Sequence, residues 1–324
     1  MLDPTELYQI VDGRTDDAED VLDVPGRHAI EADGPVGSGR RYPVLVHHLR
    51  GYIDAGHAGR LATDHLMATF PTTEIAEFDV DQLLDYRARR PAMTYDRDHW
   101  ADYDTPKLAL YAVEDVAGAP FLLLTGPEPD TQWERFSAAV IELVDRYGVE
   151  LTIGLNAIPM AVPHTRPAGV TAHASRKALI DDYEQWTTVA KLPGSAAALL
   201  ELRLGQTGHD AMGLAVHVPH YLSETEYPQA AGALLDHLAA NSGLSLTTGA
   251  LTRAAVDVTA EIEAKVAGSE QAIKVVEALE RRYDDEVSAQ GRSSLLAEDQ
   301  PVPTGEEIGA EIERFLSEQD HEAG

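Results

Sequence analysis

The sequence predicts an α/β fold in which helices layer a mostly parallel sheet, followed by an α-helical C-terminal extension. Two observations lead to this prediction. Between about residues 40 and 245, short apolar runs alternate with segments of helical period, an order typical of parallel sheets covered by helices. After about residue 250 the strand-like runs stop, and an amphipathic helical pattern continues for almost forty residues.

The expected elements follow one another along the chain. Several expected strands are apolar at consecutive positions, which is typical of strands covered on both faces. The expected strands are 44–49, 74–78, 108–113, 121–124, 150–155 and 214–218. The expected helices between them are 57–70, 131–147, 175–186, 196–204 and 229–240. In the segment 251–287, Gly268 interrupts the helical pattern and separates two helices or marks a bend.

These patterns divide the chain into three segments. They are an α/β core domain over residues 1–250, a helical extension over 251–290, and an acidic linker with a short terminal helix over 291–324. Thr304 and Glu307 form a capping-box pattern for that last helix. The formal net charge is −30, of which residues 1–33 (ten acidic, two basic) and 297–324 (nine acidic, one basic) each carry −8. Such acidic ends are typically solvated and favour solubility.

The composition excludes several classes of protein. With 25 Lys plus Arg against 55 Asp plus Glu, the chain is not expected to bind nucleic acid, whose phosphates require a basic surface. With no Cys, it forms neither disulfides nor thiolate metal sites. No secretory signal is recognisable at the start, and the longest apolar runs are strand-sized. We therefore expect a cytoplasmic protein with no membrane partner.

Standard catalytic signatures are missing from the sequence. It contains no G-x-x-x-x-G-K-[ST] phosphate loop, no G-x-G-x-x-G, no G-x-S-x-G and no H-E-x-x-H. None of the 13 His residues follows a strong metal-ligand spacing, and the adjacent His47 and His48 face opposite sides of a strand. The sequence therefore assigns no catalytic residue, no metal and no cofactor.

Polar residues concentrate instead in segments beside the expected strands. Asp54 and His57 lie between a strand and a helix, where Asp54 can cap that helix. Glu128 and Asp130 precede the helix 131–147, for which Asp130 is a natural N-cap. The candidate crevice or binding residues are Asp54, His57, Glu128, Asp130, Met160, His164, Arg166, His173, His209, Asp210 and His220.

The longest of these segments, residues 154–167, has prolines at positions 159, 163 and 167 that forbid a regular helix. We expect an extended loop there. Long defined loops inside compact domains are usually functional, so binding and simple loop packing both stay open for it.

Taken together, these segments resemble the proteasome assembly chaperone 2 family, in the longer form carried by actinobacteria. The matching stretches are LRGYIDAGHAG (49–59), LTGPEPDTQWERF (124–136), GLNAIPMAVPHTRP (154–167), LPGSAAALLELRLGQTGHDAMGLAVHVPHYL (192–222) and the following YPQAAGALLDHL. They occur in the family's order and cover about residues 40–245. The C-terminal helices resemble the extension of the actinobacterial members.

The resemblance implies a phosphorylase/hydrolase-like three-layer core and homo-oligomers or paired subunits, with a trimer among the assemblies to be considered. It also implies a role that the family has in eukaryotes and archaea, the assembly of the proteasome core particle without ATP hydrolysis. The family brings no established catalytic set. We therefore expect a non-enzymatic, chaperone-like scaffold that binds copies of itself and a protein partner such as proteasome subunits.

The alternative hypothesis is a small-ligand-binding protein or an enzyme that uses a phosphorylase-like crevice. Its polar lining would be Asp54, Glu128, His164, Arg166, His209 and Asp210. Convergence of these residues in one pocket favours the alternative, whereas their dispersal into helix caps and core hydrogen bonds disfavours it. A third hypothesis, a carboxylate–amine ligase, is weakened by the missing phosphate loop and by the presence of only five Lys.

Overall fold

A computed structural model describes residues 2–11, 42–183 and 189–288 of the 324-residue chain. The chain divides into two compact units, residues 1–283 and 284–324. The first unit holds the sheet and its helices. The described part of the second is the end of helix α8 (Glu270–Ser288). The division expected near residue 250 stays a prediction.

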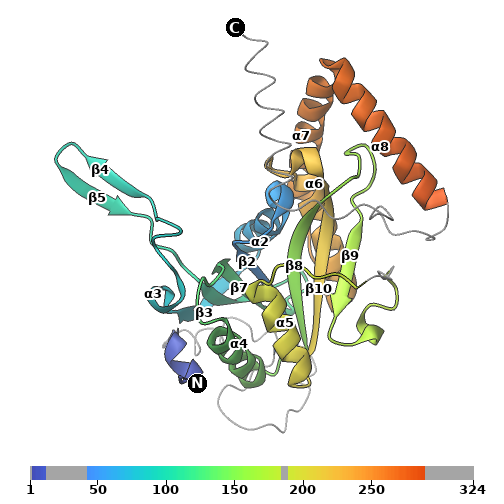
Figure 1. Ribbon diagram of the computed structural model, residues 1–324. Helices are drawn as coiled ribbons and strands as arrows, with labels where there is room; N and C mark the ends of the chain where they lie inside the picture. Colours follow the sequence, from blue (N-terminus) through green and yellow to red (C-terminus); the bar gives the residue numbers. More distant parts are fainter. Residues whose placement is uncertain (1, 12–41, 184–188, 289–324) are drawn as a thin grey trace. The chain divides into compact units, whose positions relative to one another are not determined.

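The first unit is built on an eight-stranded sheet of order β1-β3-β6-β7-β2-β8-β10-β9 (Figure 1). The central strands β7, β2, β8 and β10 are parallel to their neighbours in this group. β6 and β9 flank them in the opposite direction, β3 returns to the central direction, and β1 opposes it. The strands are β1 (Tyr8–Ile10), β2 (Val44–Arg50), β3 (Thr72–Phe78), β6 (Ala109–Glu114), β7 (Pro120–Pro127), β8 (Leu151–Met160), β9 (Val170–Ala174) and β10 (Asp210–Pro219).

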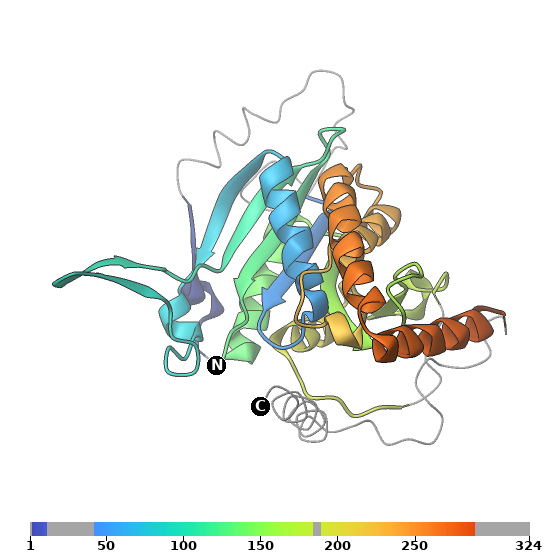
Figure 2. The same ribbon diagram turned by 90° about the horizontal axis from the view of Figure 1, so that it is seen from above.

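Helices cover both faces of this sheet, which gives three layers (Figure 1, Figure 2). α2 (Ala58–Thr69), α6 (Pro228–Ser242) and α7 (Gly249–Ala267) pack on one face, while α4 (Trp133–Tyr147) and α5 (Ala196–Gln206) pack on the other. Each face of the sheet has its own hydrophobic core, and alternate side chains of strand β7 point into the two cores. Its Phe121 and Leu123 enter the first core, and Leu122 and Leu124 enter the second. The predicted α/β class with a mostly parallel sheet and C-terminal helices is confirmed.

Local sequence signals fix where the helices begin and end. In α4 the apolar residues Phe136, Val140 and Leu143 recur at helical spacing and are buried. Gly148 then ends this helix in the left-handed conformation. Ser195 caps α5 by accepting a hydrogen bond from the Ala198 N–H (3.1 Å). In the extension, α7 ends before Gly268 and α8 follows, so the interruption at Gly268 separates two helices.

The helix expected over 175–186 is wrong for the described residues. Strand β9 ends just before it, and a single 3-10 turn, η3 (Lys177–Leu179), follows. Ser175 extends the pairing to β10, because its backbone N–H donates to the Ala211 carbonyl (2.8 Å) and its hydroxyl accepts from the Ala211 N–H (3.0 Å). These long-range bonds outweigh the local helical pattern. Residues 184–188 lie outside the described residues.

The loop expected over 154–167 is shorter than predicted, because β8 continues to Met160. The ladder between β2 and β8 ends at the pair His47 and Gly154. Beyond that point the pairing of β8 is with β10, apart from an isolated bridge between Ala157 and Asp54. Pro159, which has no N–H, therefore fits a part of the strand with one open edge.

A two-stranded hairpin, β4 (Met93–Asp96) and β5 (His99–Tyr103), was not predicted. It projects away from the α/β layers (Figure 1, Figure 2). Its strands escape sequence detection because they contain no apolar run. The remaining short elements are η1 (Pro4–Leu7), η2 (Ala55–His57), α3 (Val80–Leu83) and η4 (His220–Leu222).

Two predicted features fall outside the described residues. They are most of the acidic N-terminal segment, from residue 12 onward, and the acidic linker with its terminal helix, including Thr304 and Glu307. Among the helices of the described ranges, none combines the length and the apolar character needed to cross a membrane.

Candidate functional site

The parallel strands β7, β2, β8 and β10 end at one edge of the sheet, which we call the carboxyl edge. In open α/β sheets this edge is where ligand crevices form. The candidate residues at or just after these strand ends are Asp54, His57, Glu128, Asp130, Met160, His164, Arg166 and His220. In contrast, Asp210 begins β10 at the opposite edge, His209 precedes it, and His173 lies within β9.

Asp54 is a helix cap with a buried histidine behind it. Its carboxylate accepts hydrogen bonds from the backbone N–H groups of Gly59 (2.7 Å) and Arg60 (3.0 Å) at the start of α2. Nε2 of His48, a fully buried side chain on β2, lies 3.4 Å from Asp54 Oδ2. Burial alone would raise the pKa of Asp54, but His48 and the two N–H groups outweigh it, so the pKa is lowered. The predicted capping role of Asp54 is confirmed.

His57 stands beside this cap as the first residue before α2. Its backbone is left-handed, with φ of 51°, and follows Gly56 at φ of 62°. This turn carries the chain from the strand end into the helix, and Gly56 bonds to Ser223 and Tyr227 through its backbone. His57 therefore lies in a tight turn at the carboxyl edge.

Glu128 and Asp130 hold neighbouring chain segments. Glu128 is buried, and its Oε1 accepts a hydrogen bond from the Ala196 N–H (2.7 Å) at the start of α5. Burial raises the pKa of Glu128 above its usual value. Asp130 does not cap α4; it accepts from the Asp85 N–H (2.8 Å) and forms an ion pair with Arg89. Both carboxylates are thus occupied by structural contacts.

A pocket of about 730 Å³ lies at the carboxyl edge between the loop after β8 and the helices α6 and α7. Of the candidate residues, His164 and Arg166 line it. Threonines from α7 and small residues from α6 form much of its wall, and Asp236 and Glu263 add negative charge. The full lining is His164, Thr165, Arg166, Pro167, Ala168, Pro228, Gln229, Gly232, Ala233, Asp236, His237, Thr248, Leu251, Thr252, Ala255, Thr259 and Glu263.

The two candidate side chains in this pocket are held by partners from distant segments. His164 is buried, its Nδ1 lies 2.7 Å from the Tyr221 hydroxyl, and its backbone N–H donates to the same oxygen (3.0 Å). Burial lowers the pKa of His164, although Glu263 and Glu280 act against it. Arg166 forms an ion pair with Glu280 of α8 (3.3 Å). Both candidate side chains of the pocket are therefore engaged by other residues of the chain.

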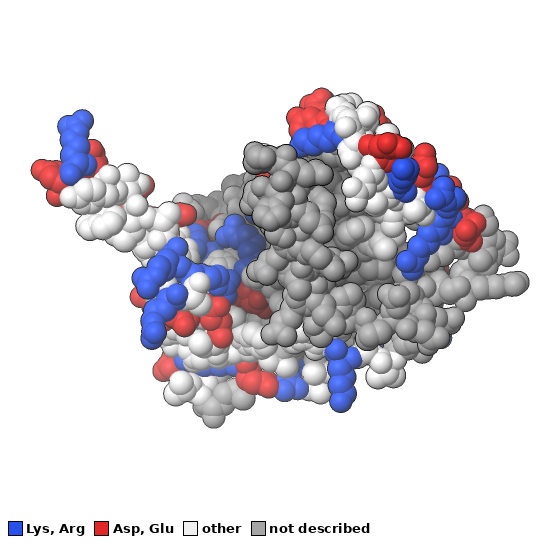
Figure 3. Space-filling model, turned by 45° about the horizontal axis from the view of Figure 1, so that its top comes forward, with Lys and Arg blue, Asp and Glu red and all other residues white. Residues whose placement is uncertain are grey.

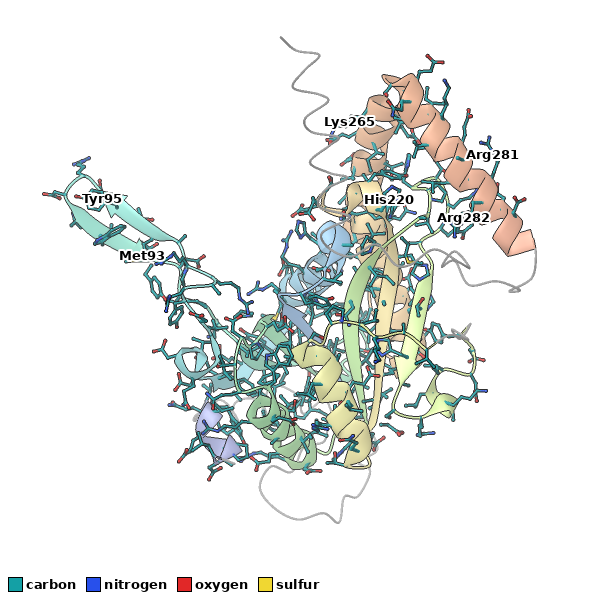
Figure 4. All side chains as sticks on the ribbon, viewed as in Figure 1. Met93, Tyr95, His220, Lys265, Arg281 and Arg282 are labelled. Atoms are coloured by element: carbon teal, nitrogen blue, oxygen red, sulfur yellow. The ribbon has the colours of Figure 1, made fainter. Side chains whose placement is uncertain are left out.

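Two further candidates lie beside this pocket without lining it. Met160 ends β8, is buried, and is paired in register with Pro219 of β10. His220 follows that strand, and its ring packs edge-on against Tyr221 with 5.4 Å between the ring centroids. Figure 4 places His220 near the end of β10, below α7. Neither residue lines the pocket; His220 contacts Tyr221, which bonds to His164.

The remaining candidates lie away from this pocket and are paired locally. His209 Nε2 lies 2.9 Å from Asp145 Oδ1, and Asp210 forms a two-pronged ion pair with Arg176 (2.5 Å at each oxygen). Arg176 lowers the pKa of Asp210. His209 and Asp210 are therefore turned to different partners and do not act on one another.

His173 belongs to a row of four residues that runs across four strands. The register pairs His47 with Gly154, Gly154 with Gly213, and Gly213 with His173. A Cβ on Gly154 would lie 2.8 Å from His47 Cε1, and one on Gly213 would lie 2.2 Å from His173 Cε1. The glycines therefore make room for the two imidazole rings. His47 is buried, which lowers its pKa to about 4, while His173 Nδ1 lies 2.9 Å from Glu201 of α5.

These placements bear on the alternative hypothesis of one polar crevice. The candidate residues do not converge: His164 and Arg166 share a pocket, Asp54 and Glu128 cap helices, and Asp210 lies at the opposite edge of the sheet. Within the described ranges, no group of three or more His, Cys, Asp or Glu residues is placed to hold a metal ion.

A second pocket, of about 460 Å³, was missed by the sequence reasoning. It lies where the hairpin leaves the body and is lined by the cations Arg50, Arg89, Arg90 and Lys107, together with Leu84, Pro91, Asp104, Thr105, Pro106 and Pro127. Lys and Arg side chains gather in this region in Figure 3. The available signal was the run Arg87-Ala88-Arg89-Arg90, a local basic cluster in a chain of net charge −30.

The sheet order, the three layers and the pocket at the carboxyl edge define the class of the protein, an α/β three-layer protein with a pocket where parallel strands end. The chain belongs to the PAC2 family, which matches residues 48–266. The resemblance inferred from the sequence motifs is thereby confirmed. Among curated proteins, the comparison gives no match.

Several solved structures are similar to this chain. Rv2714 of Mycobacterium tuberculosis, a protein of unknown function, is 47% identical with a TM-score of 0.76, covering 88% of this chain and 90% of that one. A Corynebacterium glutamicum protein of unknown function is 38% identical with a TM-score of 0.76, covering 87% and 98%. Rv2125, a Mycobacterium tuberculosis proteasome-assembly chaperone homologue, is 25% identical with a TM-score of 0.67, covering 72% and 99%.

Proposed function

We propose that the protein is a non-enzymatic, chaperone-like scaffold that forms homo-oligomers and binds a protein partner in the cytoplasm. Membership of the PAC2 family supports this proposal, as does the likeness to Rv2125, which is named as a proteasome-assembly chaperone homologue. Proteasome subunits are the partner we propose first. The likeness in fold suggests a class of function, whereas the choice of partner depends on the surface residues of this chain.

The observation that carries the proposal is the distribution of exposed apolar side chains. At the carboxyl edge Asp54, Glu128 and His164 are hydrogen-bonded within the chain. Large apolar side chains are exposed just after β2 (Tyr52 and Ile53) and on two other elements. On the α7–α8 pair these are Val256, Ile273 and Val275, and on the hairpin they are Met93, Tyr95, Trp100 and Tyr103. Apolar side chains gathered on the surface mark sites where another protein binds.

An assembly assay tests the proposed function. The full chain is mixed with purified α- and β-subunits of an actinobacterial proteasome, and the yield of core particle is followed on native gels. We expect the chain to bind subunits and to raise the yield. The double variant Val256→Asp/Val275→Asp should lose this effect. Leu202→Asp, at an equally open apolar position on α5, is the matched control and should keep it. A chain of monomeric mass that binds no subunit contradicts the proposal.

The pocket between α6 and α7 supports the alternative, a small-ligand-binding protein. Its volume of about 730 Å³ suits a metabolite, and His164 with Arg166 gives it polar contacts. Thermal-shift screening against nucleosides, phosphates and organic acids tests this alternative. Gly232 lines the pocket with open space where a Cβ would stand, so Gly232→Leu fills it. A ligand of this pocket should raise Tm in the wild type and not in Gly232→Leu.

A further inference from the structure

We propose that the pocket between α6 and α7 binds an uncharged, polyhydroxylated ligand of the sugar or polyol class. Two neutral histidines, His164 and His237, each present an Nε2–H donor to this ligand, and carboxylates of the lining accept hydrogen bonds from it. The inference rests on the ligand-binding alternative and is independent of the scaffold function, because it concerns the pocket and not an exposed apolar surface.

The Tyr221 hydroxyl determines which nitrogen of His164 carries the hydrogen. The backbone N–H of His164 donates to this hydroxyl oxygen (3.0 Å), and His164 Nδ1 lies 2.7 Å from it. Burial lowers the pKa of His164 and raises the pKa of Tyr221, so the imidazole is neutral and the hydroxyl keeps its proton. Among the described residues, Nδ1 is the acceptor bonded to this hydroxyl. The hydroxyl therefore donates to Nδ1, and the hydrogen of the ring lies on Nε2.

Tyr183 and Asn241 fix the tautomer of His237 in the same way. Asn241 Nδ2 donates to the His237 carbonyl (2.7 Å), which sets the orientation of its amide, and also to the Tyr183 hydroxyl (2.6 Å). That hydroxyl lies 2.9 Å from His237 Nδ1. Burial raises the pKa of Tyr183 and lowers the pKa of His237. The Tyr183 hydroxyl therefore donates to Nδ1, and His237 also carries its hydrogen on Nε2.

Both Nε2–H groups are left for the pocket. His164 lines it from the loop after β8 and His237 from α6, which lies beside α7 (Figure 1, Figure 2). Neither Nε2 has a hydrogen-bond partner in the part of the chain that the structure describes. His164 is only 3% exposed, so its donor has little access to bulk water. A buried donor without a partner costs free energy, and a ligand with an acceptor removes that cost.

The helices around the pocket supply acceptors. Asp236 of α6 and Glu263 of α7 line the pocket, and neither makes a hydrogen bond or an ion pair with another described residue. Thr252 and Thr259 lie two turns apart along α7 and add hydroxyl oxygens to the lining. The pocket thus combines fixed donors with open acceptors.

This combination selects the class of ligand. Arg166 is paired with Glu280 (3.3 Å), so an anionic ligand meets the two carboxylates Asp236 and Glu263 without an open cation to offset them. A cationic ligand meets two N–H donors. A hydroxyl group both donates and accepts, so it bonds to an imidazole N–H and to a carboxylate alike. Leu251 adds apolar surface for the C–H groups of a sugar, and the volume of about 730 Å³ lies in the range of small-molecule sites.

The first test identifies the two tautomers in the full chain without a ligand. Nitrogen NMR chemical shifts of the imidazole rings are measured at neutral pH, and His164→Gln and His237→Gln assign the signals. We expect hydrogen on Nε2 in both rings. Tyr183→Phe should convert His237 to a mixture of tautomers and leave His164 unchanged, because it removes the hydroxyl bonded to Nδ1. Tyr86→Phe, which removes a hydroxyl bonded to Asp81 outside the pocket, is the matched control and should change neither ring.

The second test measures binding by isothermal titration calorimetry with probes of similar size. Glucose, maltose and sorbitol are uncharged, gluconate and glucose phosphate are anions, and glucosamine is a cation. We expect an uncharged probe to bind at least about tenfold more tightly than each charged one. Gly232→Leu, which fills the pocket, should abolish this binding.

Variants of His237 test the role of its donor. His237→Phe keeps a ring but removes the N–H, and it should weaken binding of the best uncharged probe by about fivefold or more. His237→Gln supplies an amide N–H in place of the imidazole donor and should recover most of the affinity. His99→Phe, at an exposed histidine outside the pocket, is the control and should bind as the wild type does. Thermal denaturation checks that each variant is folded.

The outcomes separate this inference from the proposed function. Tighter binding of a charged probe, or no binding of any uncharged probe at millimolar concentration, overturns the ligand class and leaves the scaffold function standing. Hydrogen on Nδ1 of both rings overturns the assigned donors. Equal binding by His237→Phe and wild type does the same. A chain that binds an uncharged probe as expected but no proteasome subunit supports the inference and contradicts the scaffold function.

Discussion

The carboxyl edge of the sheet and the β4–β5 hairpin are both rich in polar and aromatic side chains, yet they use them differently. At the edge, Asp54 and Glu128 accept hydrogen bonds from the starts of helices, and His164 bonds to Tyr221. On the hairpin, Tyr95 and Trp100 contact one another and otherwise face solvent. In this protein the polar residues picked out in the sequence mostly make structural contacts within the chain. Surfaces whose side chains lack such contacts are better candidates for binding. Substitutions in the two regions test this contrast.

The largest expected effect is at a glycine of the carboxyl edge. A Cβ on Gly59 would lie 2.4 Å from Cε1 of the buried His48, so Gly59→Ala should displace the ring that backs Asp54. We expect a loss of about 3 kcal/mol in the free energy of unfolding, measured by urea denaturation. Gly232→Ala is the matched control in α6, where a Cβ meets nothing within 4 Å and should stabilise by up to about 1 kcal/mol. Equal effects at both glycines would show that the edge is not tightly packed.

The next effect is a dependence of stability on pH that arises at His47. Burial lowers its pKa to about 4, whereas the ordinary value is 6.5. Between these values the unfolded chain binds a proton that the folded chain does not, so stability falls as pH falls through this window. The slope should be about 1.4 kcal/mol per pH unit, or about 2 kcal/mol between pH 6.5 and pH 5.

His47→Asn is the variant that isolates this contribution, since it removes one titrating group and should reduce the slope of unfolding free energy against pH. His217, whose pKa burial also lowers to about 4, should keep part of the slope in that variant. His99→Asn, at an exposed position of the hairpin, is the control and should leave the slope unchanged. A slope that His47→Asn does not alter would mean that the row of glycines and histidines opens to water.

A smaller effect is expected at the Asp54 cap. Asp54→Asn should lower the free energy of unfolding by about 1 to 2 kcal/mol at pH 7. The reason is that the start of α2 and His48 then face a neutral amide in place of the carboxylate. The pKa of Asp54 is below its usual 3.8 in the folded protein, so this contribution is complete above that pH and is lost as pH falls through the folded value. The unfolding curves of variant and wild type should therefore approach one another below pH 3.8. Asp64→Asn, an exposed carboxylate on the same helix, is the control.

The smallest effect on folding is expected on the hairpin. Trp100→Ala should change the free energy of unfolding of the body by less than about 0.5 kcal/mol, because the side chain has few contacts within its own chain. Urea denaturation of the variant and the wild type measures this difference. A Trp100 variant that unfolds the body would place the hairpin in the core and erase the contrast between the two regions.

Much of the core could be predicted from the sequence, because its signal is local. Runs such as the one ending in Leu122, Leu123 and Leu124 are apolar at consecutive positions, and only a strand covered on both faces buries all of them. The cap residues Asp54 and Ser195 and the stop at Gly148 likewise act within a few residues of themselves. The family resemblance rested on loop motifs of the same local kind.

The tertiary structure decided the features that depend on distant partners. In the described part of the expected helix 175–186 there is only a 3-10 turn, and Ser175 instead bonds to Ala211 of β10. The row of His47, Gly154, Gly213 and His173 exists only through the register of four strands. The candidate site residues were chosen by residue type. The partners of His164, Arg166 and Asp210 are Tyr221, Glu280 and Arg176, which lie far from them along the chain. Composition and periodicity therefore determined the layers, since burial of apolar runs is a short-range property. Pairing between segments decided which polar groups are satisfied and which surface is left open, because that depends on contacts the chain makes only when folded.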